Sequence, residues 1–310
     1  MRIIAGLIGA ALSGMASFGQ AMNTNQITGE WELNGNLSAS IGAPLQWRGD
    51  IVPSLETVII AGQNARVLRL PALAPEQAMI MPHGALPNGG GTNVNEFTLL
   101  MDVMWPAESD AAWRAILQSD PSNAEDAILF VNPANLIGIN NNYEGEVPAN
   151  VWHRLALVYS LTNGTLTKYL NGDTNAFTQT LGNSVVDSRF SLRPTALLFS
   201  DDSGETAPVL INSLQFRSVA MTAEGIAALG AATAGGISGA PGEAVEVKIE
   251  RIEKVSAEIV LAVSGGGSLQ LQKTASLAAV AWQNIGAPAA TNTFRVPADG
   301  AKAFFRFERR

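Results

Sequence analysis

The sequence predicts an all-β chain, in which a two-sheet antiparallel jelly-roll sandwich is followed by a small C-terminal β-sandwich module. Short apolar or alternating segments recur between Trp31 and Phe216, and Gly, Asn, Asp or Pro bound each of them. Shortly after that span, a single segment has the pattern of a helix with both ends marked. A stretch rich in Ala and Gly then precedes a second series of short alternating segments.

The composition is that of a globular protein. The 310 residues are 47% hydrophobic and 15% charged, and they include no cysteine. A chain of this size can bury an adequate core without cross-links. The lack of cysteine excludes disulfides, thiolate metal sites and thiol catalysis.

The charge pattern narrows the range of partners. Acidic residues outnumber basic ones by 27 to 19, and the basic residues form no run. This balance argues against nucleic acid or an anionic membrane as the partner. With His83 and His153 the only histidines, metal-hydrolase and triad chemistry are hard to assemble.

The first 21 residues have the order of a secretory signal. Arg2 precedes an apolar run at 3–12, and small residues then lead to Ala21, after which we expect cleavage. The run is too short for a spanning helix, although an uncleaved anchor is the alternative. We therefore expect a secreted chain, extracellular or periplasmic, with no membrane insertion after the signal is removed.

The main unit is expected to span residues 28–237. Its predicted strands are 30–33, 57–60, 66–70, 96–104, 113–118, 127–131, 153–160, 165–170, 191–199 and 209–217. Asn163 and Gly164 predict a hairpin between two of them. Trp152 is expected to cap the core, and His153 to be a hydrogen-bonded residue at a strand edge.

The predicted helix covers residues 223–229. Thr222 is a good N-cap and Gly230 a good C-terminal stop. We expect this helix to plug one end of the sandwich.

Several segments of the main unit resemble the laminin-G-like and concanavalin-A-like jelly rolls of secreted bacterial proteins. They are FTLLMDV at 97–103, WRAILQ at 113–118, NVWHRLALV at 150–158, LTKYLNG at 166–172, INSLQF at 211–216 and MTAE at 221–224. The resemblance implies a jelly roll and a binding role. Relatives often hold calcium with an acidic pair at the start of the last strand, where this chain has Asn212 and Ser213.

The segment 200–205 is the candidate metal site. Asp201, Asp202 and Glu205 lie there with two serines, and hard oxygen ligands at this spacing suit Ca²⁺. The alternative is a solvated acidic turn. No other cofactor is expected.

The segment 139–146 is the candidate ligand-binding loop. Asn140, Asn141 and Asn142 carry amides that can pair with vicinal sugar hydroxyls, and Tyr143 can stack on a pyranose ring. An ordinary Asn-rich loop is the alternative.

Enzyme templates find no match. Glu96 and Asp102 are an even number of residues apart and so share a strand face, but no carboxylate lies between them as in concanavalin-A-like glycosidases. The Gly-x-Ser-x-Gly and His-Glu-x-x-His motifs are also missing. We therefore expect no enzymatic activity.

The C-terminal part is expected to be a separate unit. Residues 231–242 have the composition of a flexible linker, and residues 238–242 are its last part, after the end of the main unit. Residues 243–310 are expected to form the small β-sandwich domain. Its predicted strands are 244–252, 258–263, 268–273, 281–285, 292–296 and 303–307. This part resembles a β-module found at the end of secreted bacterial proteins, with Trp282 and Phe304 in its core.

Together these observations predict a secreted, non-catalytic binding module for carbohydrate recognition or adhesion. Its partner would be an extracellular glycan or a cell-surface protein. A structural or protein-interaction accessory protein is the second interpretation, and a hydrolase acting on polysaccharides or phosphoesters is the third.

Overall fold

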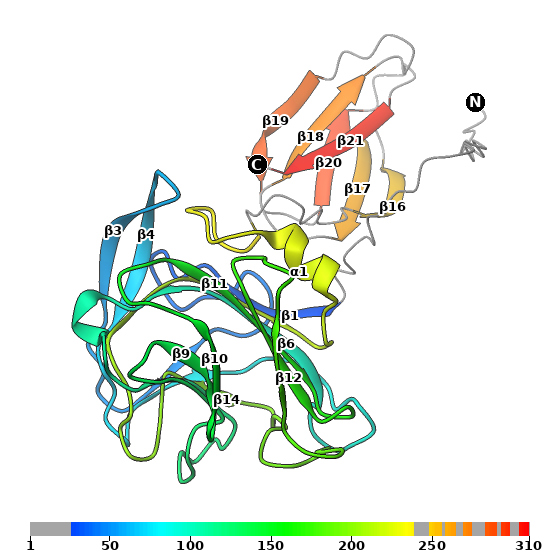
Figure 1. Ribbon diagram of the computed structural model, residues 1–310. Coiled ribbons are helices and arrows are strands. Elements are labelled where there is room, and N and C mark those ends of the chain that lie inside the picture. The colour runs from blue at the N-terminus through cyan, green and yellow to red at the C-terminus, as the bar shows by residue number, and fades with distance from the viewer. Residues whose placement is uncertain are drawn as a thin grey trace.

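The computed structural model describes residues 26–238, 248–255, 258–264, 269–274, 283–289, 293–297 and 304–309. These residues are mostly in antiparallel strands, with α1 (Ala223–Leu229) as their α-helix (Figure 1). The predicted all-β sandwich is confirmed. The predicted signal peptide at 1–21 lies outside the described residues.

One sheet of the sandwich has eight strands. Its order is β13-β12-β11-β6-β15-β4-β3, and β1 pairs with β15. The strands are β1 (Ile27–Trp31), β3 (Ser54–Ile60), β4 (Gln63–Leu70), β6 (Glu96–Met104), β11 (His153–Ser160), β12 (Thr165–Leu170), β13 (Phe177–Thr180) and β15 (Val209–Arg217). Four predicted strands, 96–104, 153–160, 165–170 and 209–217, have the observed bounds, and the predicted hairpin at Asn163 and Gly164 joins β11 to β12.

The other sheet has seven strands, in the order β10-β9-β8-β7-β14-β5-β2. They are β2 (Gln46–Arg48), β5 (Ala78–Met81), β7 (Arg114–Gln118), β8 (Leu129–Val131), β9 (Leu136–Ile139), β10 (Asn142–Glu146) and β14 (Ala196–Leu198). The sequence pattern did not predict β2, β5, β9 and β10 of this sheet, or β13 of the larger sheet.

The core lies between the two sheets, and the alternation of the long strands builds it. Phe97, Leu99, Met101 and Val103 of β6 all belong to this core, which also takes side chains from β8 and β9 of the other sheet. The residues between them on β6 must point to the outer face of the eight-stranded sheet.

The middle of that outer face is partly apolar and is buried beneath the segment 222–238, which we name the C-terminal cover. Ile226 and Leu229 of α1 pack on Leu100, Val158 and Tyr169. Thr222 caps the helix as predicted, because its hydroxyl accepts a hydrogen bond from the N–H of Gly225. The helix therefore lies on a sheet face, and the expectation that it plugs one end of the sandwich is wrong.

A buried ion pair attaches this cover to the sheet. Arg154 on β11 binds Asp102 on β6 through two bonds of 2.7 Å, and both side chains are at most 2% exposed. The same guanidinium donates to the carbonyls of Leu229 and Gly236. Glu96 and Asp102 do point to the same face, but Asp102 is sealed inside this pair.

The expected flexible linker is wrong for residues 231–237. Ala232 and Ile237 are buried, and the N–H of Ile237 donates to the hydroxyl of Ser213. The amide of Asn212 donates to the carbonyl of Thr233. These two polar side chains of β15 therefore hold the cover in place.

Two aromatic predictions need correction. Trp152 is half-buried and packs on a separate apolar cluster that includes Val67, Leu210 and Ala232, so it does not cap the core between the sheets. His153 is buried on the interior strand β11, and its Nε2 lies 3.2 Å from the carbonyl of Pro148, so it is hydrogen-bonded but not at an edge.

The C-terminal residues form two further three-stranded sheets, β16-β17-β20 and β19-β18-β21. The strands are β16 (Lys248–Val255), β17 (Glu258–Ser264), β18 (Leu269–Thr274), β19 (Gln283–Ala289), β20 (Thr293–Pro297) and β21 (Phe304–Arg309), so all six predicted strands are confirmed with shifted ends. The described core includes Leu261, Leu271 and Phe294. Trp282 lies outside the described residues, as does the side chain of Phe304.

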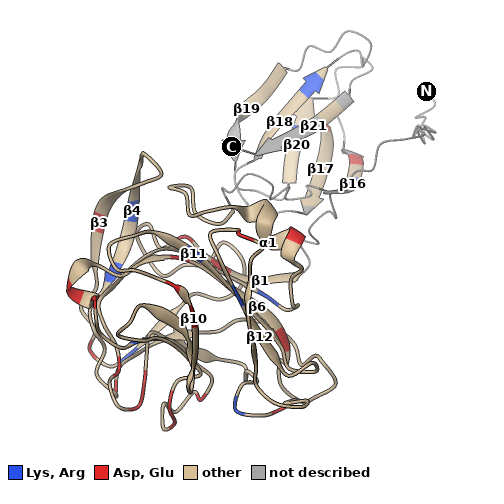
Figure 2. Cartoon of the chain, viewed as in Figure 1, with Lys and Arg blue, Asp and Glu red and all other residues tan. Residues whose placement is uncertain are grey.

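No helix in the described part of the chain has the length and hydropathy needed to cross a membrane. Acidic positions are spread over several strands and loops of the sandwich, with fewer basic ones among them (Figure 2).

The ion pair gives a stability prediction. Asp102→Asn leaves the charge of Arg154 buried without a counter-charge, so the free energy of unfolding should fall by about 3 to 5 kcal/mol. Urea denaturation measures this. Glu56→Gln is the matched control, because Glu56 pairs with Arg69 at the surface and should cost under about 1 kcal/mol. Equal losses in the two variants would contradict the role given to the buried pair.

Candidate functional site

The outer face of the seven-stranded sheet carries the candidate site. Tyr143 on β10 pairs with Gly138 on β9, Gly138 with Phe130 on β8, and Phe130 with Ala115 on β7. Residues directly opposite one another point to the same face of a sheet. Their neighbours Leu129, Val131, Ile137 and Ile139 enter the core, so this row points outward.

Three aromatic rings meet on this face. Trp113, just before β7, lies edge-on to Phe130, with ring centroids 5.9 Å apart, and edge-on to Tyr143 at 5.7 Å. Phe130 is buried and Tyr143 is half-buried, whereas Trp113 is 36% exposed. We name Trp113, Phe130 and Tyr143 the aromatic cluster.

Three carboxyl groups form an acidic cluster on the same side of the sheet. Asp126, Asp201 and Glu205 each place an oxygen within 4.8 Å of the other two. Asp126 is exposed, Glu205 is half-buried and Asp201 is buried. The pKa of Tyr143 rises to about 12, first through burial and then through the negative charges of Asp126 and Glu205. The N–H of Ala115, which packs with Phe130 and Tyr143, donates to the carbonyl of Glu205, so the acidic cluster and the aromatic cluster belong to one surface.

Asp201 organises its own loop. One carboxylate oxygen accepts the N–H of Ala127, and the other accepts the hydroxyl and N–H of Ser203 and the N–H of Glu205. Burial alone would raise the pKa of Asp201, but these hydrogen bonds outweigh it and lower the pKa.

The pKa values of Asp126 and Glu205 shift in the opposite direction, upward. Burial raises the pKa of Asp126, and the charge of Asp201 raises it further. Burial and the charges of Asp201 and Asp126 raise the pKa of Glu205. The cluster thus combines one firmly ionised carboxylate with two that hold a proton more readily.

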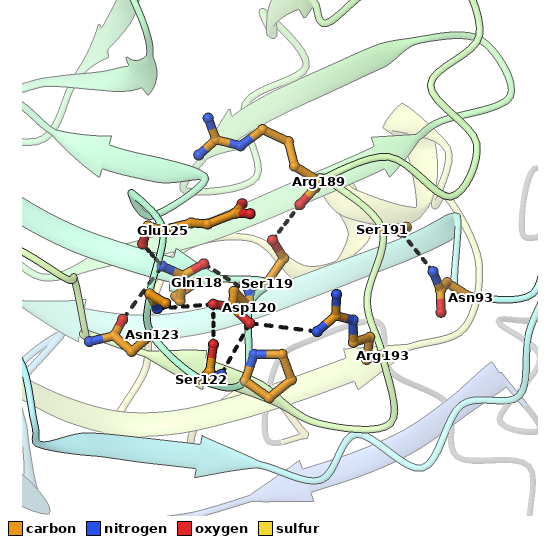
Figure 3. Close-up of polar contacts among 12 residues, drawn as sticks. Asn93, Gln118, Ser119, Asp120, Ser122, Asn123, Glu125, Arg189, Ser191 and Arg193 are labelled. Carbon is orange, nitrogen blue, oxygen red and sulfur yellow. Dashed lines mark hydrogen bonds and ion pairs between the residues drawn. The ribbon is translucent and has the colours of Figure 1, made fainter.

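The loop that carries Asp126 is held by polar contacts (Figure 3). The amide of Gln118 donates to the carbonyl of Glu125, and the hydroxyl of Ser119 donates to the carbonyl of Arg189. Asp120 accepts from the hydroxyl and N–H of Ser122. These bonds fix the course of residues 118–126, and with it the position of Asp126 beside Asp201.

The structure brings some of the predicted site residues together and places others apart. Asp201 and Glu205 meet as expected, but their third member is Asp126, while Asp202 is exposed and lies outside the cluster. Tyr143 belongs to the aromatic cluster. Asn140, Asn141 and Asn142 form the exposed β9–β10 hairpin turn and the start of β10. The sequence did not indicate Asp126, Trp113 and Phe130 as site residues, because strand pairing and the loop contacts of Asp201 bring them to one surface.

The chain has low similarity to known proteins. No protein-family model matches it, and no curated protein matches it. Among solved structures, domain 4 of AbnA, a GH43 extracellular arabinanase from Geobacillus stearothermophilus in complex with arabinotriose, is 17% identical with a TM-score of 0.44, over 65% of this chain and 97% of that one.

Two other solved structures are similar at the same level. The binding domain of botulinum neurotoxin DC in complex with rat synaptotagmin II is 10% identical with a TM-score of 0.46, over 87% of this chain and 70% of that one. Trypanosoma rangeli sialidase is 10% identical with a TM-score of 0.43, over 67% of this chain and 33% of that one. These values identify neither the laminin-G-like nor the concanavalin-A-like family, and they carry no functional argument.

The raised pKa of Asp126 predicts a dependence of stability on pH. Because the folded state favours the protonated form, ionisation of Asp126 at pH 7 destabilises the fold. Asp126→Asn should raise the free energy of unfolding at pH 7, and the gain should vanish below about pH 3.9, where the unfolded chain is also protonated. Urea denaturation across this range tests it. Glu32→Gln, which removes an exposed charge that is not among the charges acting on Asp126, is the control. A less stable Asp126→Asn at pH 7 would contradict the account.

The calcium site remains a prediction. Ions that bind only the folded state stabilise it by about 2.7 kcal/mol at a hundredfold excess over Kd, or roughly 5 to 10 °C in Tm for a sandwich of this size. If the acidic cluster binds Ca²⁺, Asp126→Asn should abolish the shift between calcium and EDTA, and Asp202→Asn should keep it. Equal melting of the parent protein in calcium and in EDTA would contradict the prediction.

Proposed function

We propose that this chain is a non-catalytic binding module that takes a glycan on the outer face of its seven-stranded sheet. One observation carries the proposal: the partly exposed Trp113 and the half-buried ring of Tyr143 pack together. They lie beside Ala115, whose N–H donates to the carbonyl of Glu205 in the acidic cluster. The interpretation of a secreted chain supports an extracellular ligand.

The chemistry of the two clusters suits a sugar. Tyr and Trp offer an apolar ring and a polar end, which match the apolar face and the hydroxyl rim of a pyranose. Carboxyl groups accept hydrogen bonds from hydroxyls, and a charged acceptor makes the stronger bond. A sugar-binding site of this kind needs few polar groups, provided that they are held in place. The hydrogen bonds of residues 118–126 hold Asp126 in place.

The same geometry favours binding over hydrolysis. A retaining glycosidase needs two carboxyls about 5 Å apart, one acting as acid and one as nucleophile. Asp201, the ionised member of the cluster, is buried, and its oxygens already accept four hydrogen bonds. Its oxygens therefore have no free approach for a substrate carbon, and we assign Asp126 and Glu205 to hydrogen bonding of hydroxyls.

Binding to insoluble polysaccharides and to a glycan array tests the proposal. Trp113→Ala should weaken binding by about tenfold or more, because central aromatic residues dominate such interfaces. Trp152→Ala is the matched control, since this half-buried tryptophan packs on the opposite sheet.

Three outcomes would overturn the proposal. One is a parent protein that binds no glycan, and another is an equal loss of binding in both tryptophan variants at equal Tm. Release of reducing sugars from a bound polysaccharide would overturn the non-catalytic assignment. Capture of a cell-surface protein with no glycan binding would favour the accessory-protein interpretation.

A further inference from the structure

A groove of about 970 Å³ lies beside the aromatic cluster, where the two sheets end. Its walls come from β10, the last strand of the seven-stranded sheet, and from β13, the last strand of the eight-stranded sheet. The lining includes Tyr143, Glu144 and Glu146 on one side, and Asp173, Asn175 and Phe177 on the other.

A close approach of the two edge strands shapes the floor of the groove. Gly145 has a φ of +91°, and a Cβ there would lie 2.8 Å from the ring of Phe177. The ring therefore rests against the backbone of β10, where the register with β9 shifts between Tyr143 and Glu146. A glycine and a bulge at this point let an aromatic ring from the other sheet enter the groove.

Tyr143 connects the groove to the aromatic cluster. Its ring contacts Trp113 on the outer face of the sheet, and the same residue lines the groove. A ligand that covers Trp113 and Tyr143 can therefore continue over Phe177 without leaving the surface.

The lining combines apolar and polar groups. Leu136, Leu170 and Phe177 provide apolar surface, while Asn171, Asn175 and Thr178 provide amides and a hydroxyl. The charged side chains of the lining are the carboxylates of Glu144, Glu146 and Asp173, with no Lys or Arg among these described residues. This excess of negative charge opposes an anionic ligand.

We propose that the glycan bound here is an uncharged polysaccharide chain, whose successive units run from the aromatic cluster into the groove between β10 and β13. This inference rests on the proposed function, and it adds a second binding site, the length of the ligand and its charge. Uronate and sialylated glycans should bind more weakly, because their carboxylates would face Glu144, Glu146 and Asp173.

Titration calorimetry with uncharged gluco-, manno- and xylo-oligosaccharides of increasing length tests this inference. In the series that binds, hexasaccharides should bind at least about tenfold more tightly than disaccharides, since the longer chain adds contacts in the groove. Asn175→Trp fills the groove and should remove this length dependence, while disaccharide binding remains. Asn64→Trp, at an exposed position of the β3–β4 hairpin, is the matched control and should behave as the parent.

The outcomes separate the two proposals. The groove proposal is overturned if affinity does not depend on the length of the oligosaccharide, or if the Asn175→Trp variant keeps that dependence. In either case, a loss of binding in Trp113→Ala can still support the proposed function. Equal affinity for a carboxylated chain of the same length overturns the charge assignment. Failure of every oligosaccharide and polysaccharide to bind the parent protein overturns the proposed function and the groove together.

Discussion

The buried pair of Asp102 and Arg154 determines which face of the sandwich is left for a ligand. A guanidinium in an apolar site must satisfy its donors, and two of its bonds go to carbonyls of the C-terminal cover. The cover is thereby fixed on the eight-stranded sheet, together with the apolar contacts of α1. The middle of that sheet is thus covered on both faces, whereas the seven-stranded sheet presents an exposed tryptophan on its outer face.

The candidate site is a product of strand pairing. Its aromatic cluster joins residues from β8, β10 and the segment before β7, and its acidic cluster joins the loops before β8 and after β14. The register of β7 to β10 aligns the outward side chains, and the hydrogen bonds of Asp201 fix the two acidic loops against each other. A charged and a stacking group are thus brought together on a rigid sheet, as binding sites require.

The sequence predicted the long strands best, because β6, β11, β12 and β15 combine apolar residues with clear turns at their ends. It did not predict β2 and β5, because these strands are three and four residues long, which is too short to show a clear alternation of apolar and polar residues. The error over residues 231–237 has a packing reason. A Cβ at Gly236 would lie 3.0 Å from the side chain of Ser213, so small residues that resemble a linker are needed for close contact. For the site, the sequence indicated Tyr143, Asp201 and Glu205 but not their common surface, since no local pattern relates Asp126 to Asp201.

Hydrogen exchange with and without a bound polysaccharide tests the central claim most directly, because it reports where on the sandwich the ligand lies. The account predicts slower exchange in residues 113–118, 126–131 and 142–146, and no change in α1 or in the β3–β4 hairpin. Protection confined to α1, the C-terminal cover or that hairpin, with none on β7, β8 and β10, would contradict it.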